Sequence, residues 1–342
     1  MANLFIDSFD HYATADGGLK YEHWEDSTVN VADGYLGTNC LGAAMAAYIR
    51  PRAVKRVVNS PADALVWGFR WKTGSSFPLS GFYVAYILTA CHYSAGTFSN
   101  STKQISINLT HEGRLEIRRG NWNGTLLATS TDIVLTGPDV WHYVEVRALI
   151  ANSGGTVTVS VDDVVAVSYT GDTQYLASSN VNAAEFVGWS TDDAYINDTS
   201  GVAPHNGFYG SGFHVQVLRP AADDSVTWLP TSGDNYTNVD DTTPDGTSDV
   251  TTSGAGDQDT YQLETLVNPY RVLTLQANVW ASGGGTLAPV VEIDAVTYDG
   301  DTSIVPGTPF DLRAIWPVNP ASGLRWTTST INAARWGFRR LS

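Results

Sequence analysis

The chain has 342 residues, of which 43% are hydrophobic and 11% aromatic, which is enough apolar side chain for about two packed domains. This composition excludes a disordered chain and a small disulfide-stapled scaffold. The 19 basic and 35 acidic residues give a formal net charge of −16, so the molecule repels phosphate backbones and we expect no nucleic-acid partner.

Export and membrane signals are absent from the sequence pattern. The N-terminus, Met1 to Asp7, lacks a basic segment followed by an apolar run, and no stretch of about 18 apolar residues occurs. We therefore expect synthesis in the cytosol and no membrane partner. The two cysteines, Cys40 and Cys91, follow no metal or redox spacing and are interpreted as small apolar side chains, with a disulfide between them left open.

Short strands are predicted throughout the first 220 residues. Each is a run rich in β-branched and aromatic residues that ends at Gly, Asn, Asp or Pro. The runs are 65–71, 82–89, 104–110, 114–118, 141–149, 156–161, 164–169, 184–190 and 212–218. Because no helical periodicity separates them, the sequence predicts an all-β fold with a jelly-roll β-sandwich over residues 1–220.

An acidic tract follows, over residues 221–268. Between Pro220 and Tyr270 there is no Lys, Arg or His, and ten acidic residues fall in this stretch. A tract rich in Thr, Ser, Gly and Asp buries little apolar surface and is typical of a solvated linker. Trp228, Val239 and Tyr261 favour the other interpretation, an extended arm that packs on a partner.

A smaller β domain is predicted over residues 269–342. Residues 270–280 and 288–298 are two long strand candidates joined by a turn at Gly283, Gly284 and Gly285. A third apolar run covers 311–316, and a closing segment covers 329–341. No internal repeat of fixed period occurs, which argues against a propeller or a solenoid.

Catalytic patterns are weak. Glycan-cleaving jelly rolls need two carboxylates on one strand, two residues apart, so that both face the substrate. Only Glu292 and Asp294 approach this pattern, and the third acidic residue expected just downstream is missing. The seven histidines form no metal-binding motif, and none adjoins a nucleophile elbow. We predict no catalytic residue and a protein that is not an enzyme.

One acidic loop is a candidate metal site. Asp192, Asp193 and Asp198 lie within seven residues and could supply oxygen ligands for Ca²⁺. The loop lacks the spacing and the glycine of an EF-hand, so an Asx-type turn is the competing interpretation. No other cofactor is expected.

Two further surfaces are predicted. Among the eleven tryptophans, Trp122 and Trp326 flank polar residues or turns and could stack on a sugar as exposed aromatic plates. The dense basic cluster, Arg50, Arg52, Lys55 and Arg56, has the opposite charge to the acidic tract. We interpret the cluster as a docking patch for the tract of a neighbouring subunit, with these tract residues in the interface: Asp223, Asp224, Asp240 and Asp241.

Four segments together resemble a known family. They are Phe9 to Tyr12, the W-x-Y-V-E-V strand at 141–146, the G-x-V-x-V-x-V-D hairpin at 155–162 and the acidic loop at 192–198. They are similar to the concanavalin A/laminin-G-like jelly roll of tailed-bacteriophage virion structural proteins. The resemblance implies a sandwich, an acidic tract and a small β domain in this order, and it carries over no catalytic residue.

The resemblance implies a non-enzymatic structural protein of a tailed phage particle, made in the host bacterial cytoplasm and displayed on the virion as a capsid decoration or another appendage. Its expected partners are copies of itself, as a homotrimer, and the major capsid or other virion proteins. The alternative is a glycan-binding tail-fibre or adhesin module that recognises host surface polysaccharide. A polysaccharide hydrolase is the third and weakest hypothesis, because the acidic pair is incomplete.

Overall fold

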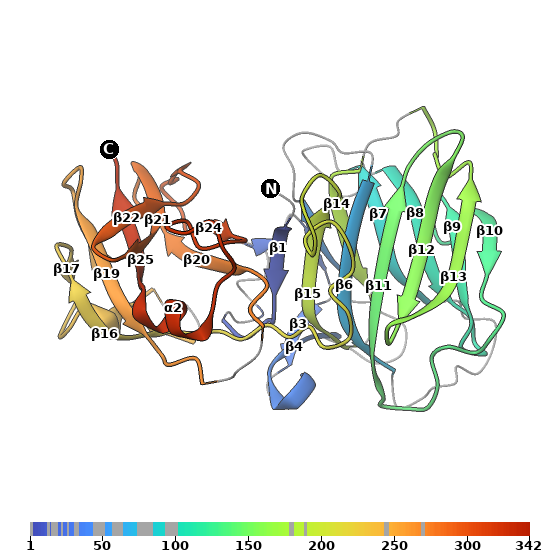
Figure 1. Cartoon of the computed structure of the whole chain (residues 1–342), viewed down its shortest axis with the longest axis horizontal. Helices are drawn as coiled ribbons and strands as arrows, with labels where there is room; N and C mark the ends of the chain where they lie inside the picture. The colour runs from blue at the N-terminus through green and yellow to red at the C-terminus, as the bar shows by residue number, and fades with distance from the viewer. Residues whose placement is uncertain are drawn as a thin grey trace. The chain divides into compact units, whose positions relative to one another are not determined.

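The chain forms two compact units, each with its own strands (Figure 1). The first contains residues 1–10 and 14–215, and the second contains 11–13 and 216–342. The structure, a computed structural model, describes residues 3–11, 14, 20–21, 23–25, 27–30, 34–43, 52–56, 64–73, 85–92, 102–177, 181–187, 190–242, 246–267 and 271–342.

The first unit is a sandwich of two antiparallel sheets. The eight-stranded sheet has the order β13-β12-β11-β6-β15-β4-β3, with β1 paired to β15. Its strands are β1 (Asn3–Asp7), β3 (Ser27–Asn30), β4 (Cys40–Ala43), β6 (Ala64–Lys72), β11 (Trp141–Leu149), β12 (Gly155–Val161), β13 (Val164–Gly171) and β15 (Ser190–Asp198).

The seven-stranded sheet has the order β10-β9-β8-β7-β14-β5-β2. Its strands are β2 (His23–Glu25), β5 (Arg52–Arg56), β7 (Ala85–His92), β8 (Thr102–Leu109), β9 (Leu115–Arg119), β10 (Thr125–Thr129) and β14 (Ala183–Val187). Together the two sheets confirm the predicted all-β jelly-roll sandwich.

The core of the first unit lies between these sheets. Phe69 of β6 meets Phe186 of β14 edge to face, with ring centroids 5.8 Å apart, and Trp67 and Trp71 are fully buried on the same side of β6. Each large apolar side chain buried in this way contributes about 1.5–3 kcal/mol. Since side chains alternate along a strand, this core decides which residues face outward.

The second unit is built around a six-stranded antiparallel sheet. Its order is β16-β19-β25-β21-β22, with β23 paired to β21. These strands are β16 (Pro220–Ser225), β19 (Gln258–Leu263), β21 (Thr286–Ile293), β22 (Val296–Asp299), β23 (Ser303–Ile304) and β25 (Arg335–Arg340). Two short ladders, β17 (Leu229–Pro230) with β18 (Val250–Thr251) and β20 (Leu275–Ala281) with β24 (Phe310–Trp316), and the helix α2 (Thr328–Ala333) complete it.

Several predicted elements have different boundaries in the structure. The predicted strand 288–298 is a hairpin, because Asp294 and Ala295 adopt positive φ angles of 52° and 61° between β21 and β22. The turn at Gly283–Gly285 connects strands of two different sheets. Residues 212–218 form no strand, while β15 follows directly on the predicted strand 184–190.

Much of the acidic tract, expected to be a linker or an arm, lies within the sheets of the second unit. It contributes β16, β17, β18, β19 and the 3-10 turn η4 (Tyr236–Asn238). Trp228, Tyr236, Val239 and Val250 pack against buried side chains of that unit, including the 1% exposed Tyr261. The prediction missed this because the tract needs few apolar residues when its carboxylates accept backbone hydrogen bonds and close the turns.

The carboxylates in the tract show this directly. Asp223 accepts from the backbone N–H groups of Asn235 (3.0 Å) and Tyr236 (2.6 Å). Asp259, fully buried, accepts from the backbone N–H groups of Thr227 (2.6 Å) and Trp228 (2.9 Å). Local turn chemistry therefore orders this acidic stretch. Across the described part of the chain, no helix is long and apolar enough to cross a membrane.

Candidate functional site

The outward face of the seven-stranded sheet carries a row of polar side chains. Along β8, Ile105, Ile107 and Leu109 are fully buried, and Ile107 and Leu109 pair with the buried Ile117 and Leu115 of β9. By alternation the intervening side chains point to the other face. They are Gln104, Ser106 and Asn108, each at most 1% exposed.

Strand β9 widens this row. Arg118 lies opposite Ser106, and Glu116 lies opposite Asn108. The Arg118 guanidinium forms an ion pair with Glu116 at 2.8 Å, and both side chains are partly exposed. The name polar row is used below for these five residues: Gln104, Ser106, Asn108, Glu116 and Arg118.

The β9–β10 connection, residues 120–124, lies on the polar row and is called the strap below. Ser106 Oγ donates to the Gly120 carbonyl (2.7 Å), Asn108 Nδ2 donates to the Trp122 carbonyl (2.7 Å), and Arg118 Nη1 donates to the Gly124 carbonyl (3.0 Å). The Trp122 side chain at the tip of the strap is 46% exposed.

One polar atom beneath the strap has no partner. Asn108 Oδ1 is buried and accepts no hydrogen bond from any residue that the structure describes, although Nδ2 of the same amide is bonded. A buried acceptor without a donor costs about 1–3 kcal/mol. A donor brought by a ligand would remove this cost.

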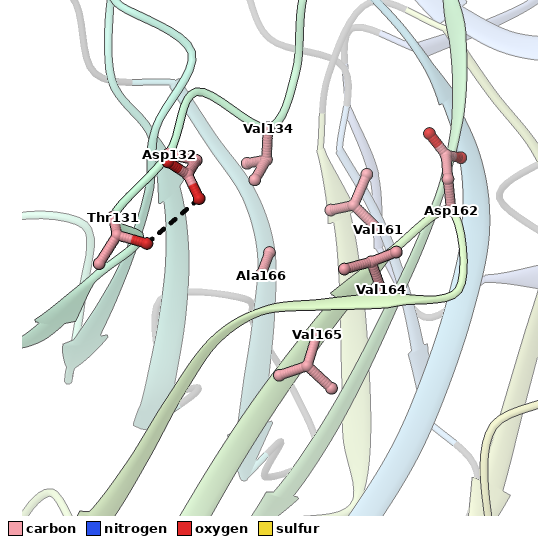
Figure 2. A pocket seen from close by; sticks show the side chains of 8 residues that line it. All are labelled: Thr131, Asp132, Val134, Val161, Asp162, Val164, Val165 and Ala166. Carbon is pink, nitrogen blue, oxygen red and sulfur yellow. Dashed lines mark hydrogen bonds between the residues drawn. The ribbon is translucent and has the colours of Figure 1, made fainter.

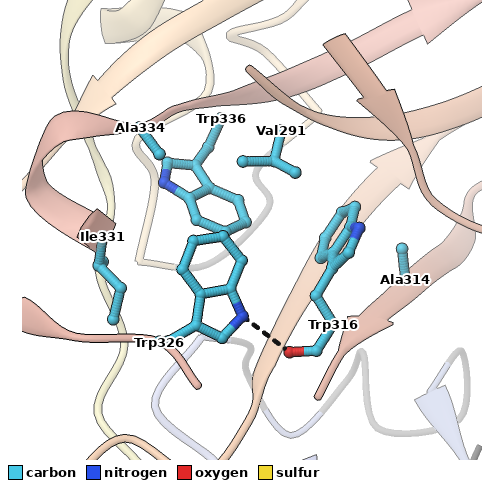
Figure 3. Close-up of a cluster of buried hydrophobic side chains, with 7 residues drawn as sticks. All are labelled: Val291, Ala314, Trp316, Trp326, Ile331, Ala334 and Trp336. Carbon is cyan, nitrogen blue, oxygen red and sulfur yellow. Dashed lines mark hydrogen bonds between the residues drawn. The ribbon is translucent and has the colours of Figure 1, made fainter. Parts of the chain in front are cut away.

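The two tryptophans predicted as sugar plates have opposite environments. Trp122 is exposed on the strap, as expected. Trp326 is 3% exposed in the core of the second unit, so its prediction as an exposed plate is wrong. Figure 3 shows its indole against that of Trp336, with Nε1 donating to the Trp316 carbonyl at 3.0 Å. The polar neighbours in sequence are turn residues, and the ring itself points inward.

The candidate calcium ligands are separated in the structure, so the predicted site is not formed. Asp192 accepts from the Tyr35 N–H (2.8 Å) and from Thr38 Oγ1 (2.9 Å). Asp198 is at the other end of β15 and accepts from the Ser200 N–H at 2.9 Å. Within the described ranges, no group of three His, Cys, Asp or Glu side chains could hold a metal ion.

Asp193 instead joins a second cluster, on the outward face of the eight-stranded sheet. It accepts from Arg70 Nε (2.9 Å) and lies 2.9 Å from His214 Nδ1. Burial, and then repulsion from Asp193, raises the pKa of Asp192 to about 8. The hydrogen bond to Asp193 raises the pKa of His214 above its ordinary value. This cluster joins β15 and β6 to the segment that follows β15.

Of the predicted docking patch, the structure describes the side chain of Lys55 alone, and this side chain is buried. Lys55 is 3% exposed, donates to the Lys20 carbonyl and lies 5.4 Å from the centroid of the Phe5 ring. Its prediction as a docking residue is therefore wrong, because its position on β5 points it into the unit. Arg52 and Arg56 are the two end residues of β5. Arg50 lies outside the described residues.

Most of the aspartates predicted to lie in the interface bind partners within the second unit. Asp223 accepts from the backbone of η4, and Asp224 forms an ion pair with Arg335 at 2.8 Å. Asp241 accepts from Ser248 Oγ at 2.8 Å, and Asp240 is partly exposed beside it. Glu292 and Asp294, the near match to a catalytic acidic pair, lie at the end of β21. Asp294 forms the hairpin turn to β22.

A shallow hollow of about 230 Å³ lies near the β12–β13 hairpin (Figure 2). Its lining is mostly aliphatic, including the 69% exposed Val164 and the 59% exposed Val165. Of its polar residues, Asp162 is already bonded to His142 Nδ1 and to the Tyr143 N–H. Thr131 and Asp132, its other polar residues, bond to each other at 3.3 Å, so the polar groups of the hollow are engaged within the fold and the polar row is the stronger candidate site.

Comparison with solved structures finds other β-sandwich proteins. A glucuronan lyase from the fungus Trichoderma reesei is 10% identical over 57% of this chain and 95% of that chain, with a TM-score of 0.41. An alginate lyase is 8% identical over 57% of this chain and 96% of that chain, with a TM-score of 0.37. A galectin from Caenorhabditis elegans is 10% identical over 43% of this chain and 90% of that chain, with a TM-score of 0.29. No protein-family model and no curated protein matches the sequence.

These matches contradict two predictions. Because the matches are polysaccharide lyases and other glycan-related proteins, two predictions are withdrawn: the non-enzymatic structural protein of a phage particle and the expectation that the chain is not an enzyme. Two of the four segments that carried the phage resemblance, 141–146 and 155–162, form the β11–β12 ladder, whose alternating side chains Val144, Val146, Val157 and Val159 are fully buried. Such a ladder meets the packing needs of the fold and carries no functional information. At these identities the lyases share a fold with this chain, and they assign it no substrate and no reaction.

Proposed function

We propose that the first unit binds a saccharide on the outward face of its seven-stranded sheet. The observation that carries this proposal is the position of Trp122: a 46% exposed indole at the tip of a strap that lies on a row of polar side chains. An exposed indole offers a flat apolar surface with a polar N–H at its edge, which can pack on a partly apolar ligand.

The chemistry of a sugar ring matches both parts of this surface. One face of a pyranose presents C–H groups, which pack on an indole, and the edges present hydroxyls, which both donate and accept hydrogen bonds. Glu116 and Arg118 provide a planar acceptor and a planar donor side by side, 2.8 Å apart. Groups of this kind can each hold two hydroxyls with fixed geometry, which gives orientation as well as affinity.

The test is a saccharide array followed by titration calorimetry on the full chain. We expect saturable binding to at least one glycan and a loss of about tenfold or more in affinity for Trp122→Ala, with partial retention for Trp122→Phe. Val202→Ala, which also removes an exposed apolar side chain in the first unit, is the matched control and should bind as the wild type does. No binding by the wild type to any glycan would contradict the proposal.

The same incubations, followed for new reducing ends, test whether a bound polysaccharide is also cleaved. Product release that depends on Glu116 or Arg118 would make this face a catalytic site. Binding without product would make it a recognition site.

A further inference from the structure

The strap covers side chains that have the composition of a binding site. Three donors of the polar row, on Ser106, Asn108 and Arg118, are each bonded to a carbonyl of the strap. The acceptor Asn108 Oδ1 beneath it has no donor. The three bonds that the strap makes to the row all use its carbonyls, which only accept, so they satisfy donors of the row and leave this acceptor unpaired.

The tip of the strap is exposed. Asn121, Trp122 and Asn123 are all exposed, and the contacts to β8 and β9 are hydrogen bonds from polar side chains to carbonyls. At the base, Gly120 lies against the Tyr175 ring and donates from its N–H to the Gln104 carbonyl at 2.8 Å. A segment with an exposed tip that is tied to the sheet by hydrogen bonds to its carbonyls belongs to the less stable part of a fold.

Hydroxyl groups complement this arrangement better than the strap does. A hydroxyl oxygen can replace each carbonyl as an acceptor, and a hydroxyl hydrogen can reach Asn108 Oδ1. A permanent cover would be served better by apolar side chains on β8, which would leave no buried acceptor unpaired.

We propose that the strap is a displaceable cover, and that a saccharide which opens it hydrogen-bonds to Ser106, Asn108 and Arg118 in its place. This inference rests on the proposed function, since it assigns the hydroxyl-binding residues of the same face. Trp122 moves with the strap and packs against the sugar ring, while the three residues beneath form hydrogen bonds to the hydroxyls of the sugar.

The first experiment is hydrogen exchange on the wild type, with and without a glycan identified by the array. The Gly124 N–H, bonded to the Asn121 carbonyl within the closed strap, should exchange at least several-fold faster when the glycan is bound, because the strap is then open. Amides of β11 and β12, on the other sheet, should not change. An unchanged strap in the presence of saturating glycan would overturn the inference while leaving the proposed function intact.

The second experiment loosens the strap. A Cβ at position 124 would lie 2.1 Å from the Arg119 carbonyl oxygen, so Gly124→Ala should open the strap and raise its exchange rate and its association rate with the glycan several-fold. Gly154→Ala is the matched control: this residue has a positive φ of 71° in another hairpin, with open space around its Cβ.

The third experiment removes the hidden contacts. Ser106→Ala and Asn108→Leu should each lower the affinity at least several-fold, with circular dichroism confirming the fold. If the wild type binds glycan and these variants bind equally well, the inference is overturned. If the wild type binds no glycan, the proposed function fails first, so the two failures are distinct.

Discussion

At the scale of single residues, burial decides what a side chain does more than its type does. Asp192, Asp193 and Asp198 belong to one strand and one residue type, yet Asp192 and Asp193 are fully buried while Asp198 is partly exposed. Asp193 is compensated by Arg70 and His214, whereas Asp192 has neutral donors only among its direct partners. A carboxylate in that position keeps its proton to a higher pH.

This difference predicts the pH dependence of the first unit. The pKa of Asp192 is raised from 3.8 to about 8, so between these pH values the folded chain holds a proton that the unfolded chain has lost. Stability therefore falls as pH rises through this window, by up to about 1.4 kcal/mol per pH unit for one group. Asp192→Asn, which mimics the protonated state, should flatten the slope of urea unfolding between pH 5 and pH 8.

His214 contributes in the same direction. Its pKa is raised, so the stability that it provides is complete at low pH and is lost as pH rises through the folded-state pKa. Asp198→Asn is the control for the Asp192 variant, because it changes a carboxylate on the same strand that bonds Ser200 near the surface. Equal slopes for Asp192→Asn and the wild type would contradict the prediction.

At the scale of elements, alternation along strands was readable from the sequence and turn geometry was not. The pattern of 141–149 predicted β11 with the correct ends, since strong period-two alternation leaves one choice of face. The alternation Gln-Ile-Ser-Ile-Asn on β8 held the signal for the polar row. It was overlooked because a polar outward face is also what an ordinary solvated strand shows, and only burial distinguishes the two.

The turns explain the other errors. Asp294 and Ala295 both adopt positive φ, which is uncommon for residues other than glycine. The turn between β21 and β22 therefore lacks the glycine by which such a hairpin is recognised in a sequence. The strap depends on backbone carbonyls of Gly120 and Trp122, which no sequence pattern specifies. Of the candidate site, the sequence therefore predicted one residue, the exposed Trp122. It did not predict the polar residues beneath the strap.

Asp259 should be the residue that orders the acidic tract. It is fully buried and also accepts from Asn235 Nδ2 (2.7 Å) and Tyr261 OH (2.9 Å), besides two backbone N–H groups. Asp259→Ala leaves these donors buried without a partner, so we expect a loss of at least about 3 kcal/mol in unfolding free energy. Limited proteolysis should then cut within residues 226–251.

The control for this prediction is Asp241→Ala, which removes an exposed carboxylate of the same tract that bonds Ser248. The control should resist protease as the wild type does. Rapid cutting of the wild type in this tract would contradict the ordered turns, and equal resistance of the Asp259 variant would contradict the role of that carboxylate.

At the scale of the whole molecule, each unit has a core of its own, so each should unfold as its own cooperative step. Trp326 packs on Trp336 within the second core. Trp326→Ala should lower the unfolding free energy of the second unit by about 3–5 kcal/mol and leave the first transition in place. Differential scanning calorimetry measures both steps, and a single transition that shifts as a whole would contradict the prediction.

Trp122→Ala is the matched comparison for Trp326→Ala. It removes the same side chain from an exposed position, and surface changes of this kind usually stay within about 0.5 kcal/mol. The two variants therefore separate binding from stability: one should lose glycan with its fold intact, and the other should lose stability in a unit that does not carry the proposed site.

The aspartates that close turns also account for part of the acidity of the molecule. Asp198, Asp223 and Asp259 each accept backbone N–H groups, a task that asparagine performs without a charge. Net charge and fold are thus separable at the partly exposed members of this set, Asp198 and Asp223. Replacing exposed turn aspartates by asparagine would reduce electrostatic repulsion between copies, and with it colloidal solubility, while the architecture stays the same.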